Sequence, residues 1–106
     1  MSTRYNPLKN KVTKMLAVTA RPMFGYQCYS ISGKFFVRFS NKNDYQVIVR
    51  LPTEQHELAI KNKGIKPFSH GAKMGWIEID SKQVRTSSAF KWITKGYDYA
   101  KNLAKV

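Results

Sequence analysis

The chain has 106 residues, of which 42% are hydrophobic and 24% charged; this composition is typical of a folded globular protein and excludes a disordered one. Its length predicts a single domain over residues 1–106. Nineteen Lys and Arg against six Asp and Glu give a net charge of +13, which attracts polyanions such as nucleic acids. The alternative is that the charge only keeps a small domain soluble.

No apolar run approaches the roughly 20 residues that a membrane span needs. The N-terminal residues contain no continuous hydrophobic stretch of the signal-peptide kind. Cys28 is the single cysteine, so the chain cannot form an internal disulfide. These features predict a cytoplasmic protein that does not associate with membranes.

The first predicted element is a helix that begins at Asn6 and Pro7, because Asn caps helices well and Pro suits the first helical position. Helical spacing then relates the apolar residues Leu8, Val12, Met15 and Leu16. The helix is expected to end near Ala20, because residues before a proline, here Pro22, are pushed away from helical angles.

The apolar period then changes from 3.6 to 2, which predicts a β-hairpin around a two-residue loop, Ser32-Gly33. In the simplest register Tyr29 faces Phe36. One face of the hairpin would then be mostly apolar and would carry Phe24, Tyr26, Cys28, Phe35, Val37 and Phe39. The opposite face would carry Gln27, Tyr29, Phe36 and Arg38.

The rest of the chain predicts two more strands, over residues 45–51 and 75–80, and a helix over residues 53–63 with Gly64 just past its end. A final helix is capped at residues 86–88; Gly96 inside it costs about 1 kcal/mol relative to Ala, so close packing is expected there. The fold class is therefore α+β: an antiparallel sheet of about four strands, with elements in the order α-β-β-β-α-β-α.

Four short motifs follow one another along the chain: RPMFG at residues 21–25, Tyr-x-x-x-Gly-x-x-Phe at 29–36, Lys-Pro-Phe at 66–68, and a segment with Trp and a Tyr-Ala pair at 92–100. In this order they resemble the TfoX N-terminal domain family, with its MmcQ/YjbR-like relatives as second choice. The resemblance implies a compact α+β domain. It also implies an association with competence regulation or DNA binding, in a group in which many members have no assigned activity.

We expect no catalytic, metal or cofactor site. One cysteine and two histidines, His56 and His70, are too few for a structural zinc. Cys28 lies on the predicted apolar face and is expected to be buried and inert. Glu78 and Asp80 share one face of a strand end, where we expect a solvated edge rather than an acid–base pair. The chain is therefore predicted not to be an enzyme.

Two surfaces are candidates for contact with nucleic acid. The first helix and its flanks supply cations for phosphates: Arg4, Lys9, Lys11, Lys14 and Arg21. The less apolar face of the sheet adds Arg38 and Arg50, with Tyr29 and Phe36 as stacking planes. The alternative is that the final helix covers this face and buries both rings in the core.

The predicted function is that of a small, non-enzymatic, basic domain: a nucleic-acid-associated module or, as the resemblance implies, a regulatory module of the transcription or competence type. The alternative is a protein–protein interaction domain with an acidic partner and no direct role in nucleic-acid binding. In that case Trp92 or Phe68 would be an exposed anchor.

Overall fold

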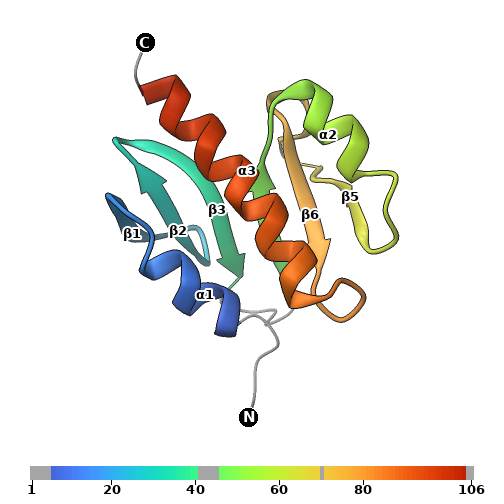
Figure 1. Ribbon diagram of the computed structural model, residues 1–106, viewed down its shortest axis with the longest axis horizontal. Helices are drawn as coiled ribbons and strands as arrows, with labels where there is room; N and C mark the ends of the chain where they lie inside the picture. Colours follow the sequence, from blue (N-terminus) through green and yellow to red (C-terminus); the bar gives the residue numbers. More distant parts are fainter. Residues whose placement is uncertain (1–5, 41–45, 70, 105–106) are drawn as a thin grey trace.

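Residues 6–40, 46–69 and 71–104 are described by a computed structural model, in which helices pack on one face of an antiparallel sheet (Figure 1). Arg4, Tyr45 and His70 lie outside the described residues. In chain order the elements are α1 (Asn6–Thr13), β1 (Val18–Met23), β2 (Tyr26–Ile31), β3 (Lys34–Ser40), β4 (Gln46–Arg50), α2 (Thr53–Ala59), β5 (Ile65–Pro67), the short 3-10 helix η1 (Ala72–Met74), β6 (Trp76–Asp80) and α3 (Thr86–Ala104). The strands lie side by side in the order β1-β2-β3-β4-β6-β5.

The α+β class and the antiparallel sheet are confirmed, but over the described residues the sheet has six strands rather than about four. The first helix ends at Thr13 instead of near Ala20. Ala17 has a φ of +64°, and the next six residues form β1, which pairs with β2 along its whole length. Pro22 suits this position, because β1 is an edge strand. The other added strand, β5, has three residues and pairs with β6, too short a run to show a period.

The hairpin of β2 and β3 has the expected turn but not the expected register. Ser32 and Gly33 both have positive φ, +49° and +80°, as a two-residue hairpin loop of this kind requires. Beyond the turn a β-bulge leaves Phe36 without a partner, so Tyr29 lies opposite Val37. Phe36 and Val37 consequently both face the helices.

Tyr29 and Phe36 are therefore core residues, and the expectation that they offer exposed stacking planes is wrong. They are 4% and 0% exposed. The ring of Phe36 meets Tyr97 of α3 edge-on, with 5.5 Å between ring centres, and Tyr29 meets Phe39 in the same way at 5.7 Å. The hydroxyl of Tyr97 donates a hydrogen bond to the carbonyl of Leu16 at 2.7 Å, which ties α3 to the segment before β1.

Two local expectations are also corrected. Phe24 was placed on the apolar face of the hairpin, but it lies at the β1–β2 turn and is 92% exposed. The second helix ends at Ala59 with Ile60 as its C-cap, so Gly64 does not follow it directly. Among the described residues, no helix is long and apolar enough to cross a membrane.

Candidate nucleic-acid interface

One face of the sheet points away from the helices. Within the described ranges, α1, α2 and α3 all contribute to one core cluster, which contains Val37, Val49 and Ile77. These residues pair with one another across β3, β4 and β6, so their neighbours in each strand point to the opposite side. We call this opposite side the open face. Its described members include Arg21, Tyr26, Cys28, Phe35, Arg38, Gln46, Ile48, Trp76, Glu78 and Asp80.

The open face carries an apolar patch of its own. Ile48 and Trp76 are 0% and 6% exposed, and Tyr26 and Phe35 pack beside them half-buried. The sequence grouped Tyr26 and Phe35 with Val37 and Phe39 on one apolar face, but the bulge divides this set: Val37 and Phe39 face the helices, whereas Tyr26 and Phe35 lie on the open face. Half-buried aromatic rings are thus present on the face opposite the helices, although they are different rings from the two expected.

The segment between β5 and β6 closes one end of this patch. The amide of Phe68 donates a hydrogen bond to the carbonyl of Trp76 at 3.1 Å. Gly71 lies against the indole so closely that an added Cβ would be 2.6 Å from Trp76 Cδ1. Phe68 is only 6% exposed, so the expectation that it is an exposed anchor for a protein partner is wrong. Trp92 of α3 is half-buried and packs against the main core.

Arg38 lies at the centre of the open face. Its guanidinium carbon is 4.4 Å from the centre of the Trp76 ring, a cation–π contact. Its Nε is buried and has no hydrogen-bond partner among the described residues. Along the same cross-strand row, Arg38 lies opposite Cys28, and Cys28 lies opposite Arg21. Since neighbouring strands are about 4.8 Å apart, the backbones of the two arginines are about 10 Å apart.

Cys28, between these arginines, is 1% exposed, as expected. Burial raises the pKa of its thiol above the usual value, while the charge of Arg38 and a backbone hydrogen bond at Met23 act in the opposite direction. A buried thiol with a raised pKa is a poor nucleophile. The row therefore presents two cations around a neutral group.

The other predicted phosphate contacts do not join this row. Lys11 lies on the helix side of the sheet, with its Nζ 5.0 Å from the ring centre of Phe90 in α3, and Lys14 is exposed just beyond α1. Lys9 is half-buried in α1, and its carbonyl accepts a hydrogen bond from Thr13. The Nε of Arg50 donates to the carbonyl of Met74 at 3.1 Å. Among the predicted cations in the described ranges, Arg21 and Arg38 therefore share this row, whereas Arg50, which pairs with Trp76 one strand further on, is engaged by the Met74 carbonyl and the Tyr99 ring.

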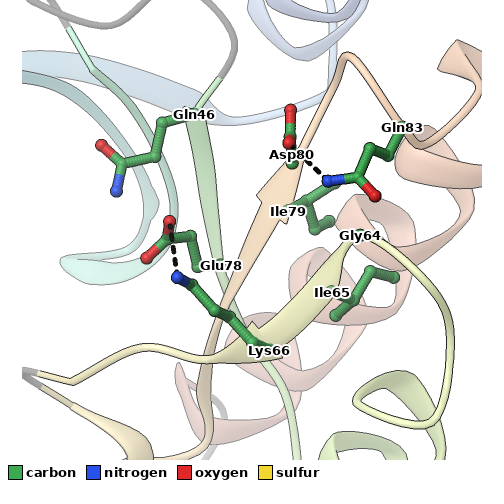
Figure 2. Close-up of a pocket in the computed structure, with 8 residues that line it drawn as sticks. All are labelled: Gln46, Gly64, Ile65, Lys66, Glu78, Ile79, Asp80 and Gln83. Atoms are coloured by element: carbon green, nitrogen blue, oxygen red, sulfur yellow. Dashed lines mark hydrogen bonds and ion pairs between the residues drawn. The ribbon is translucent and has the colours of Figure 1, made fainter.

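The far edge of the open face is hollowed and acidic (Figure 2). The hollow has a volume of about 430 Å³ and is lined by Gln46, Gly64, Ile65, Lys66, Glu78, Ile79, Asp80 and Gln83. Lys66 Nζ is 4.0 Å from Glu78 Oε2, and Asp80 accepts hydrogen bonds from the Gln83 side chain and from the amide of Lys82. The sequence predicted a solvated edge here; it could not show the hollow, whose walls come from three separate segments.

A second hollow, of about 270 Å³, lies beside the start of α3. Lys63, Arg85, Ser88 and Trp92 are among its lining residues. Lys95 Nζ lies 6.0 Å from the Trp92 ring centre. This hollow is on the helix side of the sheet, away from Arg21 and Arg38.

Comparisons of the chain with protein-family models, with curated proteins and with solved structures find no significant match. The resemblance to the TfoX N-terminal domain family therefore stays a prediction.

Proposed function

We propose that this protein is a nucleic-acid-binding module that holds a single strand on the open face of its sheet. The observation that carries the proposal is the position of Arg21 and Arg38 in one row beside two half-buried aromatic rings, Tyr26 and Phe35. Unpaired bases stack on aromatic side chains of exposed sheet faces, while cations beside the rings contact the phosphates.

The charge distribution supports a path along β1, β2 and β3. Residues 18–40 contain Arg21, Lys34 and Arg38 and no acidic residue. Glu78 and Asp80 lie on β6 of the same face, and Glu78 is two strands from Arg38 in the same row; there they would repel a phosphate backbone. A nucleic-acid strand bound here is therefore expected over β1, β2 and β3 and excluded from β6.

The lysines of the helix side have a different role in this proposal. Lys11 lies on the helix side of the sheet. In this proposal Lys11 and the exposed Lys14 attract a polyanion at long range without contacting the nucleic acid on the open face. A regulatory role of the transcription or competence type, which the resemblance implies, would be exercised through the open face.

Fluorescence anisotropy with labelled single-stranded DNA, single-stranded RNA and duplex DNA, at about 50 and 200 mM salt, tests the proposal. The variant Arg21→Gln/Arg38→Gln should lose about tenfold in affinity for single strands, and its log–log salt slope should become shallower by about 1.4, which is two phosphate contacts. Lys91→Gln/Lys101→Gln is the matched control, because it removes the same charge from exposed positions of α3.

Equal losses in the two double variants would show that binding follows net charge alone and would overturn the open-face site. Arg21→Gln by itself keeps the test decisive if the double variant is unstable, because Arg21 is exposed. Retention of a protein partner after nuclease treatment, together with no binding to any oligonucleotide, would favour the alternative of an interaction domain with an acidic partner.

A further inference from the structure

Phe24 is the most exposed of the large hydrophobic side chains in the described part of the chain. It lies at the tip of the hairpin between β1 and β2, with 92% of its surface accessible. Its φ is +52° and that of Gly25 is +81°. An added Cβ at Gly25 would meet nothing within 4 Å, so the tip projects away from the rest of the molecule.

Neither local conformation nor packing explains a phenylalanine at this position. Bulky residues strongly disfavour left-handed backbone angles, and the first position of such a turn prefers Asn, Asp or Gly. The next hairpin has the same kind of turn and carries a small polar residue there, Ser32 with a φ of +49°. A lone exposed phenylalanine needs no explanation by itself, but one that is held at a positive φ and is 92% exposed is a candidate for contact with a partner.

The tip continues the open face. Met23 and Tyr26 pair at the base of the turn, and Tyr26 belongs to the aromatic patch of that face. Arg21 is three residues before Phe24, and residues 18–31 contain no acidic side chain. The tip is thus continuous with the aromatic patch, and the hairpin is positively charged. Both features fit a nucleic-acid strand that extends from the open face past Phe24.

We propose that Phe24 is a stacking anchor that receives the unpaired base at one end of the strand bound on the open face. This inference rests on the proposed function. One exposed ring is enough to stack a base, whereas insertion into a lipid surface needs a contiguous apolar face. The next most exposed apolar side chain, Leu16 at 79%, lies before the opposite end of β1, about 20 Å of extended strand away.

The first test replaces Phe24 by residues that separate stacking from other roles. Phe24→Asn should leave the thermal midpoint unchanged or raised, because Asn tolerates left-handed angles, and should lower affinity for a single-stranded oligonucleotide roughly tenfold. Phe24→Trp should keep the affinity. Phe24→Leu should lose it as Phe24→Asn does, because leucine is apolar but cannot stack. Leu16→Asn is the matched control and should bind like the unchanged protein.

The second test locates the stacked base. Oligonucleotides that carry 2-aminopurine at one position each should show a change of fluorescence on binding at one terminal position, and Phe24→Asn should abolish that change there alone. If the protein binds oligonucleotides and Phe24→Asn or Phe24→Leu binds equally well, the anchor is overturned while the proposed function stands. If the unchanged protein binds no oligonucleotide, both are overturned. Binding to anionic phospholipid vesicles that depends on Phe24, with oligonucleotide affinity unaffected, would assign the tip to a membrane and overturn the anchor.

Discussion

The guanidinium of Arg38 in β3 reaches across β4 and lies 4.4 Å from the ring centre of Trp76 in β6. Beneath this contact is Ile48, which is 0% exposed and pairs with Arg38. The contact therefore joins Arg38 to the start of β6, next to the segment between β5 and β6 that closes one end of the aromatic patch. It also gives the proposed binding surface a spectroscopic reporter, because Trp76 is one of two tryptophans.

Arg38→Lys should preserve the charge and remove the planar contact with Trp76. We expect a loss of about 1 kcal/mol in the free energy of unfolding, since a half-buried cation–π contact is worth about 0.5–2 kcal/mol. Urea denaturation measures this loss. Both proteins also carry Trp92→Phe, so that the tryptophan fluorescence comes from Trp76 alone. Arg21→Lys, at an exposed position in the same row, should change neither the stability nor the emission. Similar effects at both arginines would contradict the contact.

Gly96→Ala tests how closely α3 approaches the sheet. Helix propensity alone predicts stabilisation by about 1 kcal/mol. However, the new Cβ would lie 2.8 Å from the carbonyl oxygen of Arg50 and 2.8 Å from Val49 Cγ1, so α3 would have to shift. We expect destabilisation by about 1–3 kcal/mol in urea denaturation. Asn102→Ala, at an exposed position of the same helix, serves as the control and should not destabilise. If Gly96→Ala were more stable than the unchanged protein, α3 would pack less closely on β4 than the structure shows.

Cys28 should make stability depend on pH in the alkaline range. Burial raises the pKa of its thiol in the folded protein, so the unfolded chain loses this proton first as pH rises. The contribution to the free energy of unfolding is complete below the unfolded-state pKa, about 8.5, and is lost as pH rises towards the folded-state pKa. Urea denaturation about one pH unit either side of that value should show a steeper decline for the unchanged protein than for Cys28→Ala.

The same burial predicts that Cys28 is protected from chemical modification. A thiol-specific disulfide reagent at neutral pH should label it only after the chain unfolds. Rapid labelling of the folded protein, with no difference in pH dependence from Cys28→Ala, would show that the thiol reaches solvent.

Glu78→Gln should change binding more than folding. Its ion pair with Lys66 is long, at 4.0 Å, and partly exposed, with 72% of the lysine and 25% of the glutamate side chain accessible, and exposed pairs contribute about 0–1 kcal/mol. In the proposed function the Glu78 carboxylate repels the phosphates of a nucleic-acid strand on the open face. Removal of this negative charge should therefore raise the affinity for single-stranded nucleic acid about twofold. Anisotropy at low salt measures the change, with Glu54→Gln on the exposed surface of α2 as control. Equal gains of affinity in Glu78→Gln and Glu54→Gln would show that binding depends on net charge alone and not on the position of Glu78.

Several features of the fold could be predicted from the sequence because their causes are local. The loop at Ser32 and Gly33 follows from its turn residues, and the buried residues Ile93, Tyr97 and Ala100 of α3 recur at helical spacing. The close packing expected at Gly96 is confirmed. A strand period also placed Tyr26 and Phe35 together on one face, as they are in the structure.

The tertiary structure decided which face of the hairpin the helix covers. Both faces carry aromatic residues, so a period of two groups the side chains without saying which group is buried. The bulge turns Phe36 towards Tyr97, a residue 61 positions later in the chain, and this leaves Tyr26, Phe35 and Arg38 on the open face.

The same long-range origin explains β1 and the hollow at Glu78. Residues 18–20 continue a helical pattern locally, yet pairing with β2 satisfies their backbone hydrogen bonds and makes them a strand. Glu78 and Lys66 are 12 residues apart in sequence and meet because β5 pairs with β6. The sequence by itself determined the α+β class and the turn at Ser32 and Gly33, but not the composition of each face, because the bulge at Phe36 divides the set of side chains that a period of two groups together. Contacts between distant segments decided which face stays open, because only their combined packing sets one face of an amphipathic hairpin against a helix and leaves the other to solvent.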